Sequence, residues 1–268
     1  MMKRGAFYKS LFLMSLVLPG SAALADAGFI FDFSNGDVIN DGSLITSIDG
    51  DATGYSSVTV YTESNFRMVV SPEDASVTIG DYYGVKEGVI HGHWKAMGGN
   101  MERLYFSRES GEAFDLNYYV LTTNSEYGGA PATGAEDTYI IASKDGVTES
   151  FRAKLPAEDW GIDKVREIYL GPEFDGIKAF WFYSEGGTYC FGMDKFYVDL
   201  DPPAPSTPDA IVVGSGTVDD LTNESPNDDD DTIPDQEDEG NDNGGTTDDN
   251  ESVPDSHHTK MVLGTALH

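Results

Sequence analysis

Residues 176–200 read Gly-Ile-Lys-Ala-Phe-Trp-Phe-Tyr, then Ser-Glu-Gly-Gly, then Thr-Tyr-Cys-Phe-Gly-Met-Asp-Lys-Phe-Tyr-Val-Asp-Leu. Two runs rich in aromatic and β-branched residues flank a Gly-Gly pair, a pattern that predicts two strands joined by a tight turn. Directly afterwards comes Asp201-Pro-Pro, where the ordered pattern stops. We therefore expect this hairpin to close a β-sandwich.

The alternation inside the first run leaves one question open. Phe180 and Phe182 lie on one side of the predicted strand, and Trp181 and Tyr183 lie on the other, because successive side chains of a strand point to opposite faces. One pair must face the core. The other pair is either a platform for a ligand or lies under a loop.

The rest of residues 26–200 repeats the same kind of pattern. About ten short apolar or alternating runs are separated by turns rich in Gly, Pro, Asn and Asp, and no run has a convincing helical period. A second hairpin is predicted at Lys144-Asp-Gly, and a third joins Val89–Ala96 to Leu104–Phe106 across Gly98-Gly-Asn. The pattern is typical of an all-β jelly-roll sandwich of about ten antiparallel strands.

The two ends of the chain differ from this middle part. Residues 1–25 have a basic start, an apolar run at Leu11–Leu18 and a small-residue site at Ala23-Leu-Ala, which predicts a secretory signal peptide. The apolar run is too short to span a bilayer, so we expect a secreted protein without membrane insertion, located in the periplasm, at the cell surface or outside the cell. Residues 201–268 read as a Pro-rich linker and an acidic disordered tail, with no fixed structure expected from about Asp209 onward.

The net charge limits the partners of this chain, and the single cysteine limits how its core is stabilised. The formal net charge is −31, which disfavours nucleic acid as a partner. The single cysteine, Cys190, cannot form a disulfide within the chain, so the core must be stable without one. We expect Cys190 to be a small buried residue, because no sequence signature of a catalytic thiol surrounds it.

The run His91-Gly-His93 carries the first candidate chemistry. Alternation places His91, His93 and Lys95 on one face of a strand. Two histidines at this spacing can share a metal ion, as they do in the cupin jelly rolls, but the glutamate that follows in cupins is missing here. We therefore expect a polar sheet face rather than a metal site.

Neighbouring strands extend this predicted face. Arg103 alternates with apolar residues in the next run, and Asp115, Asn117 and Tyr119 alternate with apolar residues in the run after it. Charged, amide and aromatic groups together suit a sugar, which needs directional hydrogen bonds and a flat apolar surface. The predicted ligand-binding set is His91, His93, Lys95, Arg103, Asp115, Asn117 and Tyr119, with Lys95 and Arg103 favouring an anionic polysaccharide.

Three short motifs resemble the carbohydrate-binding-module jelly rolls, which are galactose-binding-like sandwiches. They are Phe31-Asp-Phe-Ser-Asn-Gly near the start, the Lys144-Asp-Gly hairpin in the middle and Met193-Asp-Lys-Phe-Tyr-Val near the end. The resemblance implies glycan binding and a structural calcium ion between the first and last strands. The acids at the matching positions are Asp32 and Asp194, whereas Lys195 stands where the family often has a second acid.

Two other functions remain open at this stage. Some jelly-roll proteins are polysaccharide lyases that act on uronate polymers, and His91, His93, Arg103, Asn117 and Tyr119 are the residues that such a site would recruit. The chain lacks the strand signatures of alginate lyases. The other alternative is a structural protein of the extracellular matrix or cell surface, in which the sandwich is a spacer. Binding without catalysis is the leading interpretation.

Overall fold

A computed structural model of the protein describes residues 27–81, 88–161 and 165–222. The predicted signal peptide and the acidic segment after residue 222 lie outside the described residues. The regular secondary structure of the described part is almost all β-strand, so the prediction of an all-β fold is confirmed. The jelly-roll assignment stays a prediction.

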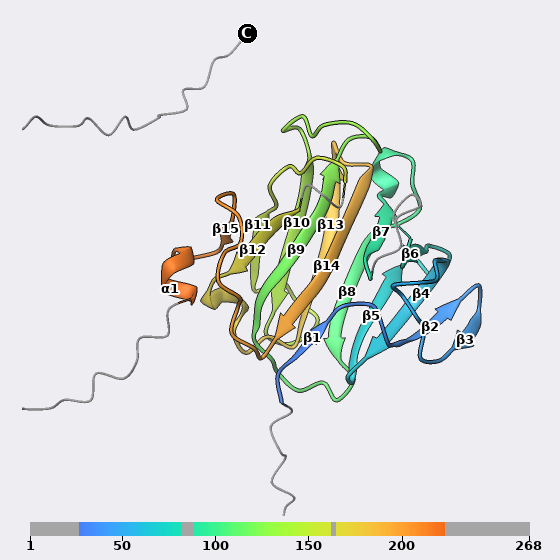
Figure 1. Ribbon diagram of the computed structural model, residues 1–268, viewed down its shortest axis with the longest axis horizontal. Coiled ribbons are helices and arrows are strands. Elements are labelled where there is room, and N and C mark those ends of the chain that lie inside the picture. Colours follow the sequence, from blue (N-terminus) through green and yellow to red (C-terminus); the bar gives the residue numbers. More distant parts are fainter. Residues whose placement is uncertain (1–26, 82–87, 162–164, 223–268) are drawn as a thin grey trace, which may run out of the picture. The chain divides into compact units, whose positions relative to one another are not determined.

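The described residues contain fifteen strands and three short helices (Figure 1). The strands are β1 (Phe29–Phe31), β2 (Asp37–Asn40), β3 (Ser43–Ile45), β4 (Tyr55–Glu63), β5 (Phe66–Ser71), β6 (Val77–Ile79), β7 (Ile90–His93), β8 (Arg103–Arg108), β9 (Leu116–Ser125), β10 (Asp137–Ser143), β11 (Phe151–Lys154), β12 (Arg166–Leu170), β13 (Ala179–Gly186), β14 (Cys190–Val198) and β15 (Ile211–Val213). The helices are the 3-10 turns η1 (Lys95–Met97) and η2 (Pro172–Phe174) and the α-helix α1 (Val218–Thr222).

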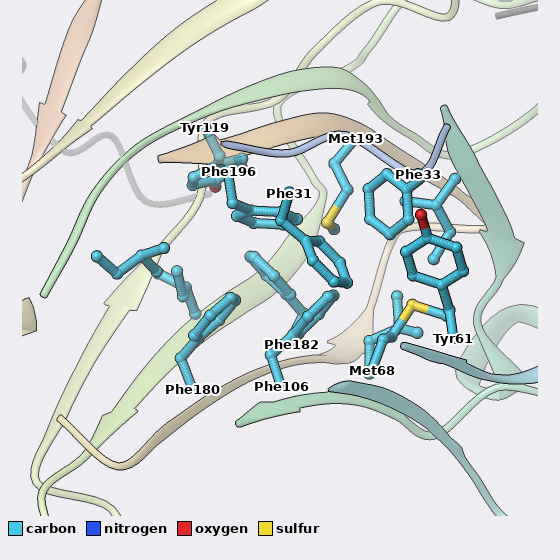
Figure 2. Close-up of a cluster of buried hydrophobic side chains, with 14 of the residues drawn as sticks. Phe31, Phe33, Tyr61, Met68, Phe106, Tyr119, Phe180, Phe182, Met193 and Phe196 are labelled. Carbon is cyan, nitrogen blue, oxygen red and sulfur yellow. The ribbon is translucent and has the colours of Figure 1, made fainter. Parts of the chain in front are cut away.

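The strands form one hydrogen-bonded path that doubles back on itself. The order is β11-β10-β13-β8-β5-β4-β6-β7-β14-β9-β12-β15, with β1 beside β14 and with β2 and β3 beyond β4. We call the half from β11 to β4 layer 1 and the half from β6 to β15 layer 2. Rings from the two halves meet in one core: Phe106 of β8 lies 5.1 Å from Phe196 of β14, and Phe182 of β13 lies 5.6 Å from Tyr119 of β9, measured between ring centroids (Figure 2). The domain is therefore a sandwich joined along one side by the β4–β6 pairing.

The stretch that suggested a closing hairpin instead crosses between the layers. β13 pairs with β10 and β8, whereas β14 pairs with β9, β7 and β1. The predicted pairing of these two runs is wrong, and the reason is that both runs direct aromatic residues into the same core from opposite sides. Gly186 and Gly187 have φ values of 153° and 67°, which side chains rarely adopt, and they let the chain cross.

The other two predicted hairpins have different outcomes. β10 and β11 pair antiparallel around Lys144-Asp-Gly, as expected. The pairing predicted between Val89–Ala96 and Leu104–Phe106 is wrong, because β7 lies in layer 2 and β8 lies in layer 1. The 3-10 turn η1 and the bridge between Trp94 and Met101 carry the chain from one layer to the other.

The folded region continues past Leu200, where the sequence predicts a linker. The expectation of no fixed structure from about Asp209 onward is wrong for residues 209–222, which contain β15 and α1. β15 adds a parallel strand to β12, and Val213 is only 5% exposed. The Glu167 carboxylate accepts hydrogen bonds from the backbone amides of Ser206 (2.9 Å) and Thr207 (3.0 Å), which fixes the proline-rich segment. Its Pro content concealed the β-branched run Ile211-Val-Val, which has the composition of a strand.

This segment covers apolar groups on the outer face of layer 2. Tyr118, Val120 and Tyr169 form a second buried cluster there, and partly buried side chains of the segment, including Val212 and Leu221, pack against it. The phenol of Tyr169 donates a hydrogen bond of 2.8 Å to the carbonyl of Pro203. Without the segment these rings would face water.

We therefore expect the position of a C-terminal truncation to decide its effect on stability. A chain ending at Thr222 keeps every contact described above, whereas a chain ending at Leu200 exposes the Tyr118–Tyr169 cluster and loses the β12–β15 pairing. Burial of one large apolar side chain contributes about 1.5–3 kcal/mol. Thermal unfolding should show a clearly lower Tm for the chain ending at Leu200. Equal Tm values for the two truncations would contradict this role of the segment.

Candidate functional site

The structure does not bring the seven predicted ligand-binding residues together. His91 and His93 lie in β7 of layer 2, whereas Arg103 begins β8 in layer 1. The residues considered for a lyase site are these three together with Asn117 and Tyr119 of β9. They too are divided between the two layers, because Arg103 lies in layer 1 and the others lie in layer 2. Only the two histidines remain neighbours, with their ring centroids 4.7 Å apart.

Three of the polar residues instead have local structural partners. The Asp115 carboxylate accepts a hydrogen bond of 2.6 Å from the backbone amide of Gly176, and the Asn117 amide donates one of 2.8 Å to the carbonyl of Leu200. Lys95 lies in η1 and pairs with the Glu102 carboxylate on the surface. These contacts join loops and strand ends.

The prediction that Tyr119 faces a ligand is wrong. Tyr119 is fully buried, and its ring stacks on Phe196 at 5.4 Å in the core (Figure 2). The reason is an irregularity in the β9–β14 pairing: Tyr197 lies opposite Tyr118, but Val198 lies opposite Leu116, so Asn117 is an extra residue. Such a bulge reverses the alternation, and Leu116 and Tyr119 both face the core.

Four half-buried aromatic residues lie together on the outer face of layer 1. Phe180 and Phe182 are fully buried, so the alternate residues Trp181 and Tyr183 of β13 face outward and are half-buried. Register places Tyr105 of β8 opposite Trp181, with ring centroids 6.2 Å apart and planes 20° apart. On the other side of β13, Tyr139 of β10 lies opposite Tyr183 at 5.4 Å and 21°.

Two arginines lie on these rings. The Arg152 guanidinium lies 3.9 Å from the centre of the Tyr139 ring and pairs with the Glu185 carboxylate. The Arg103 guanidinium lies 5.4 Å from the centre of the Tyr105 ring, within the range of a cation–π contact, and no carboxylate of the described residues forms an ion pair with it. We call these six residues, Arg103, Tyr105, Tyr139, Arg152, Trp181 and Tyr183, the arginine–aromatic face.

A groove begins beside Arg103. One cavity of about 300 Å³ is lined by Val69, Ser71, Arg103, Tyr105, Gly146 and Val147. A second cavity of about 540 Å³ shares Val69 and Ser71 with it and extends over β4 toward Ile39 and Gly42. The Tyr105 hydroxyl donates a hydrogen bond of 2.8 Å to the Gly146 carbonyl, which holds the β10–β11 turn at one end of the groove.

Two groups on this face, Tyr183 and Arg152, have raised pKa values. Burial is the main reason that the pKa of Tyr183 rises to about 12, and the hydrogen bond from its hydroxyl to Glu185 adds to the rise. The same Glu185 carboxylate raises the pKa of Arg152. At neutral pH Tyr183 is therefore a protonated phenol and Arg152 a charged guanidinium group, and both are hydrogen-bond donors.

The histidine pair lies on the outer face of layer 2, beside a different cavity. This cavity has a volume of about 410 Å³ and is lined by Gly54, Ser56, Thr78, Asp81 and the two histidines. Burial, with a contribution from His93, lowers the pKa of His91 to about 3, and burial also lowers the pKa of His93. Both imidazoles are neutral at neutral pH, so this pair offers no cation to an anionic sugar.

The two predicted calcium ligands have short local contacts. One oxygen of Asp32 accepts hydrogen bonds from the backbone amide and hydroxyl of Ser34, and one oxygen of Asp194 accepts a hydrogen bond of 2.7 Å from the amide of Lys195. Within the described ranges, neither carboxylate belongs to a cluster of three side chains able to share an ion. Calcium at Asp32 and Asp194 stays a prediction.

Comparisons with known proteins assign no family to this chain. No protein-family model, no curated protein and no solved structure matches the chain. The resemblance to carbohydrate-binding modules stays a prediction. None of the helices described here is long and apolar enough to cross a membrane.

Sequence reasoning found part of the arginine–aromatic face and missed the rest. The alternation of Phe180 to Tyr183 correctly offered Trp181 and Tyr183 as one outward pair. Tyr139 and Arg152 were missed, although they flank the correctly predicted β10–β11 hairpin, because that hairpin had no predicted neighbour. The β10–β13 pairing, which joins them to Tyr183, spans more than thirty residues of sequence and leaves no local signal.

A half-buried carboxylate near Asp32 leads to a prediction about pH. Burial raises the pKa of Glu63 from 4.5 to about 6, and the charge of Asp32 adds to the rise. The hydrogen bond of 2.9 Å that the Tyr61 hydroxyl donates to Glu63 acts in the opposite direction and lowers the pKa. Because the net shift is upward, the folded state binds the proton of the Glu63 carboxyl more tightly than the unfolded state does. The stability that this proton contributes is fully present below pH 4.5 and is lost as the pH rises through about 6. Glu63→Gln should therefore raise Tm relative to the parent at pH 7.5 and change it little at pH 4. An advantage of the variant that is equal at both pH values would contradict this assignment.

The parent protein and Asp194→Ala together test the calcium prediction. A calcium ion bound at Asp32 would favour the ionised form of nearby Glu63 and would stabilise the folded parent by mass action. Calcium should then raise the Tm of the parent, and Asp194→Ala should abolish the increase. If Tm is the same in calcium and in a calcium-selective chelator, the predicted site does not exist.

Proposed function

We propose that this protein is a secreted, non-catalytic binder of an acidic polysaccharide, and that the arginine–aromatic face with its groove is the binding site. The observation that carries the proposal is the position of Arg103. Its guanidinium is exposed, has no carboxylate partner among the described residues, and lies over Tyr105 at the end of a groove that continues across β5 and β4.

The chemistry of this end of the groove suits a sugar carboxylate or sulfate. A guanidinium group donates two parallel hydrogen bonds to a planar anion, and such charge-assisted bonds are stronger than neutral ones. The Tyr105 ring limits the orientations that the Arg103 side chain can adopt, so less entropy is lost when a ligand binds. Trp181 lies beside Tyr105 and offers apolar surface to the C–H groups of a sugar ring.

Charge on this face favours an anionic ligand over a neutral one. Exposed Lys178 lies beside Gly146, where a side-chain carbon added to the glycine would come 3.6 Å from the lysine Cβ. Arg67 of β5 projects from the same face, two residues from Val69. The acids of this face, Asp137 and Glu185, contact Tyr139 and Tyr183 on β10 and β13. The chain has a net charge of −31, so a polyanion would be attracted to the side of the face that carries Arg103 and Arg67.

The groove also fits an extended chain rather than a single sugar. Its two cavities follow one another across the strands of layer 1 and share Val69 and Ser71. Hydroxyl and apolar groups line both, and the Glu73 carboxylate lies in the second cavity, away from Arg103. A polymer that lies across several strands would place one anionic group at Arg103 and neighbouring units over β5 and β4. The signal peptide predicted for residues 1–25 agrees with a polysaccharide outside the cell.

Substitutions on the face should weaken binding without unfolding the protein, since these side chains point away from the core. We expect Trp181→Ala to reduce affinity for a uronate oligosaccharide roughly tenfold or more, as truncation of a central aromatic anchor usually does. Arg103→Lys should also weaken binding, because a lysine keeps the charge but loses the paired donors. Matched controls are Tyr127→Ala, a tyrosine that is 57% exposed in another loop, and Lys95→Ala, an exposed cation in η1.

The measurement is isothermal titration calorimetry with the full chain and a panel of uronate, sulfated and neutral oligosaccharides. Affinity for the acidic members should fall as salt is raised, because salt screens exposed charges over about 10 Å at 0.1 M. Equal binding by the parent, Trp181→Ala and Arg103→Lys would place the site elsewhere. Cleavage of the uronate polymer into unsaturated ends would instead make the protein a lyase, and binding to no member of the panel would favour the structural role.

A further inference from the structure

A second candidate site lies in layer 2, on the opposite layer from the arginine–aromatic face. We propose that His91, His93 and Cys190 form a binding site for a thiophilic transition-metal ion such as Zn²⁺. The nitrogen and sulfur atoms that these three side chains can offer all lie within 4.8 Å of one another. The inference does not depend on the polysaccharide proposal, because no residue belongs to both sites.

The strand pairing explains why the three residues meet. β7 and β14 run antiparallel, His93 lies directly opposite Cys190, and His91 lies opposite Gly192. The buried neighbours Phe191 and Met193 face the core, so alternation sends Cys190 to the outer face of layer 2, where the histidines lie.

Packing holds the ligands in this arrangement. The His93 ring stacks on the ring of Tyr189 at 4.3 Å with planes 21° apart, and Tyr189 immediately precedes Cys190. The rings of His91 and His93 are nearly perpendicular, at 84°. Ligand atoms around one tetrahedral zinc ion lie on the order of 3.5 Å apart, so rotation of the side chains suffices to close the present spacing.

Burial and access both suit a bound ion. Cys190 is fully buried and His91 is 5% exposed, whereas His93 is half-buried and lies at two cavities of about 410 and 360 Å³. An ion therefore has a path from solvent, and Asp81 or a water molecule in the first cavity could supply a fourth ligand. Such an arrangement, with three protein ligands and access for a fourth, is the pattern of open zinc sites.

The ligand types select the class of metal. A cysteine sulfur and two imidazole nitrogens suit zinc, copper or cobalt, whereas calcium and magnesium prefer oxygen ligands. This site is therefore chemically distinct from the calcium site predicted at Asp32 and Asp194. A bound metal would also shield the one cysteine of a protein that we expect in an oxidising compartment.

The test is metal binding by the full chain, with Co²⁺ as a spectroscopic probe and Zn²⁺ in competition. The sequence has five histidines, and three of them, His257, His258 and His268, lie outside the described residues. The reference protein therefore carries Gln at these three positions, so that they cannot bind the probe. We expect it to bind about one Co²⁺ with the near-ultraviolet charge-transfer band of a cobalt thiolate, and Zn²⁺ should displace the cobalt and abolish the band.

Two further variants make the result decisive. Cys190→Ser should abolish the charge-transfer band, and His93→Gln, a change at the half-buried mouth of the site, should weaken zinc affinity by roughly 100-fold or more, since even outer-shell losses cost 10–100-fold. Zn²⁺ should raise the Tm of the reference protein and not that of the variants. Circular dichroism confirms that each variant is folded. The proposal is wrong if the folded reference protein gives no thiolate band. It is also wrong if folded His93→Gln binds zinc as tightly as the reference protein does.

Discussion

The fold depends on the contact between the aromatic side chains of β13 and those of β14 across the core. Phe106 and Phe180 stack in layer 1 with ring centroids 4.6 Å apart and planes 3° apart, and Phe196 of layer 2 lies within 5.4 Å of both (Figure 2). The two runs are separated in the sequence by only a few residues, yet they come from opposite layers. Burial of these rings sets the spacing of the layers, and the glycines between the runs make the crossing possible.

The inward direction of these aromatic rings also decides which side chains of β13 and β14 point outward from each layer. Because side chains alternate along a strand, inward Phe180 and Phe182 require Trp181 to point outward from layer 1. For the same reason, inward Phe191 requires Cys190 to point outward from layer 2. A single stretch of sequence thus supplies a central residue to each proposed site, and the sandwich keeps the two sites on opposite layers. We infer that they act as separate sites.

The sequence predicted the features that depend on local pattern. The all-β class, the β10–β11 hairpin and the burial of Cys190 follow from composition, turn residues and alternation. The partners of β13 and β14 could not be predicted, because the Gly-Gly pair between them permits a hairpin and a crossing between layers equally well. For this reason the polar residues placed together on one face, such as His93 and Arg103, lie in different layers.

Irregular strand geometry accounts for the remaining errors. The extra residue at Asn117 reverses the alternation in β9 and buries Tyr119, and no sequence rule marks such a bulge when the residue is not glycine. The His91–His93 spacing was noticed, but a third ligand was sought nearby in the sequence. It lies about one hundred residues away, at Cys190, and only the β7–β14 register brings it close.

The most direct measurement of the central claim uses the three tryptophans of the chain, Trp94, Trp160 and Trp181. Each has one indole N–H, which gives a separate signal in a ¹H–¹⁵N correlation spectrum, and Trp181→Phe assigns its own signal by loss. Trp94 is buried in the core at the end of β7, with its ring 5.2 Å from that of Phe191, so it is an internal control away from the arginine–aromatic face. On titration with an acidic oligosaccharide, the account predicts a progressive shift of the Trp181 signal while the Trp94 signal stays in place. A shift confined to Trp94 or Trp160, with Trp181 unchanged, would contradict it.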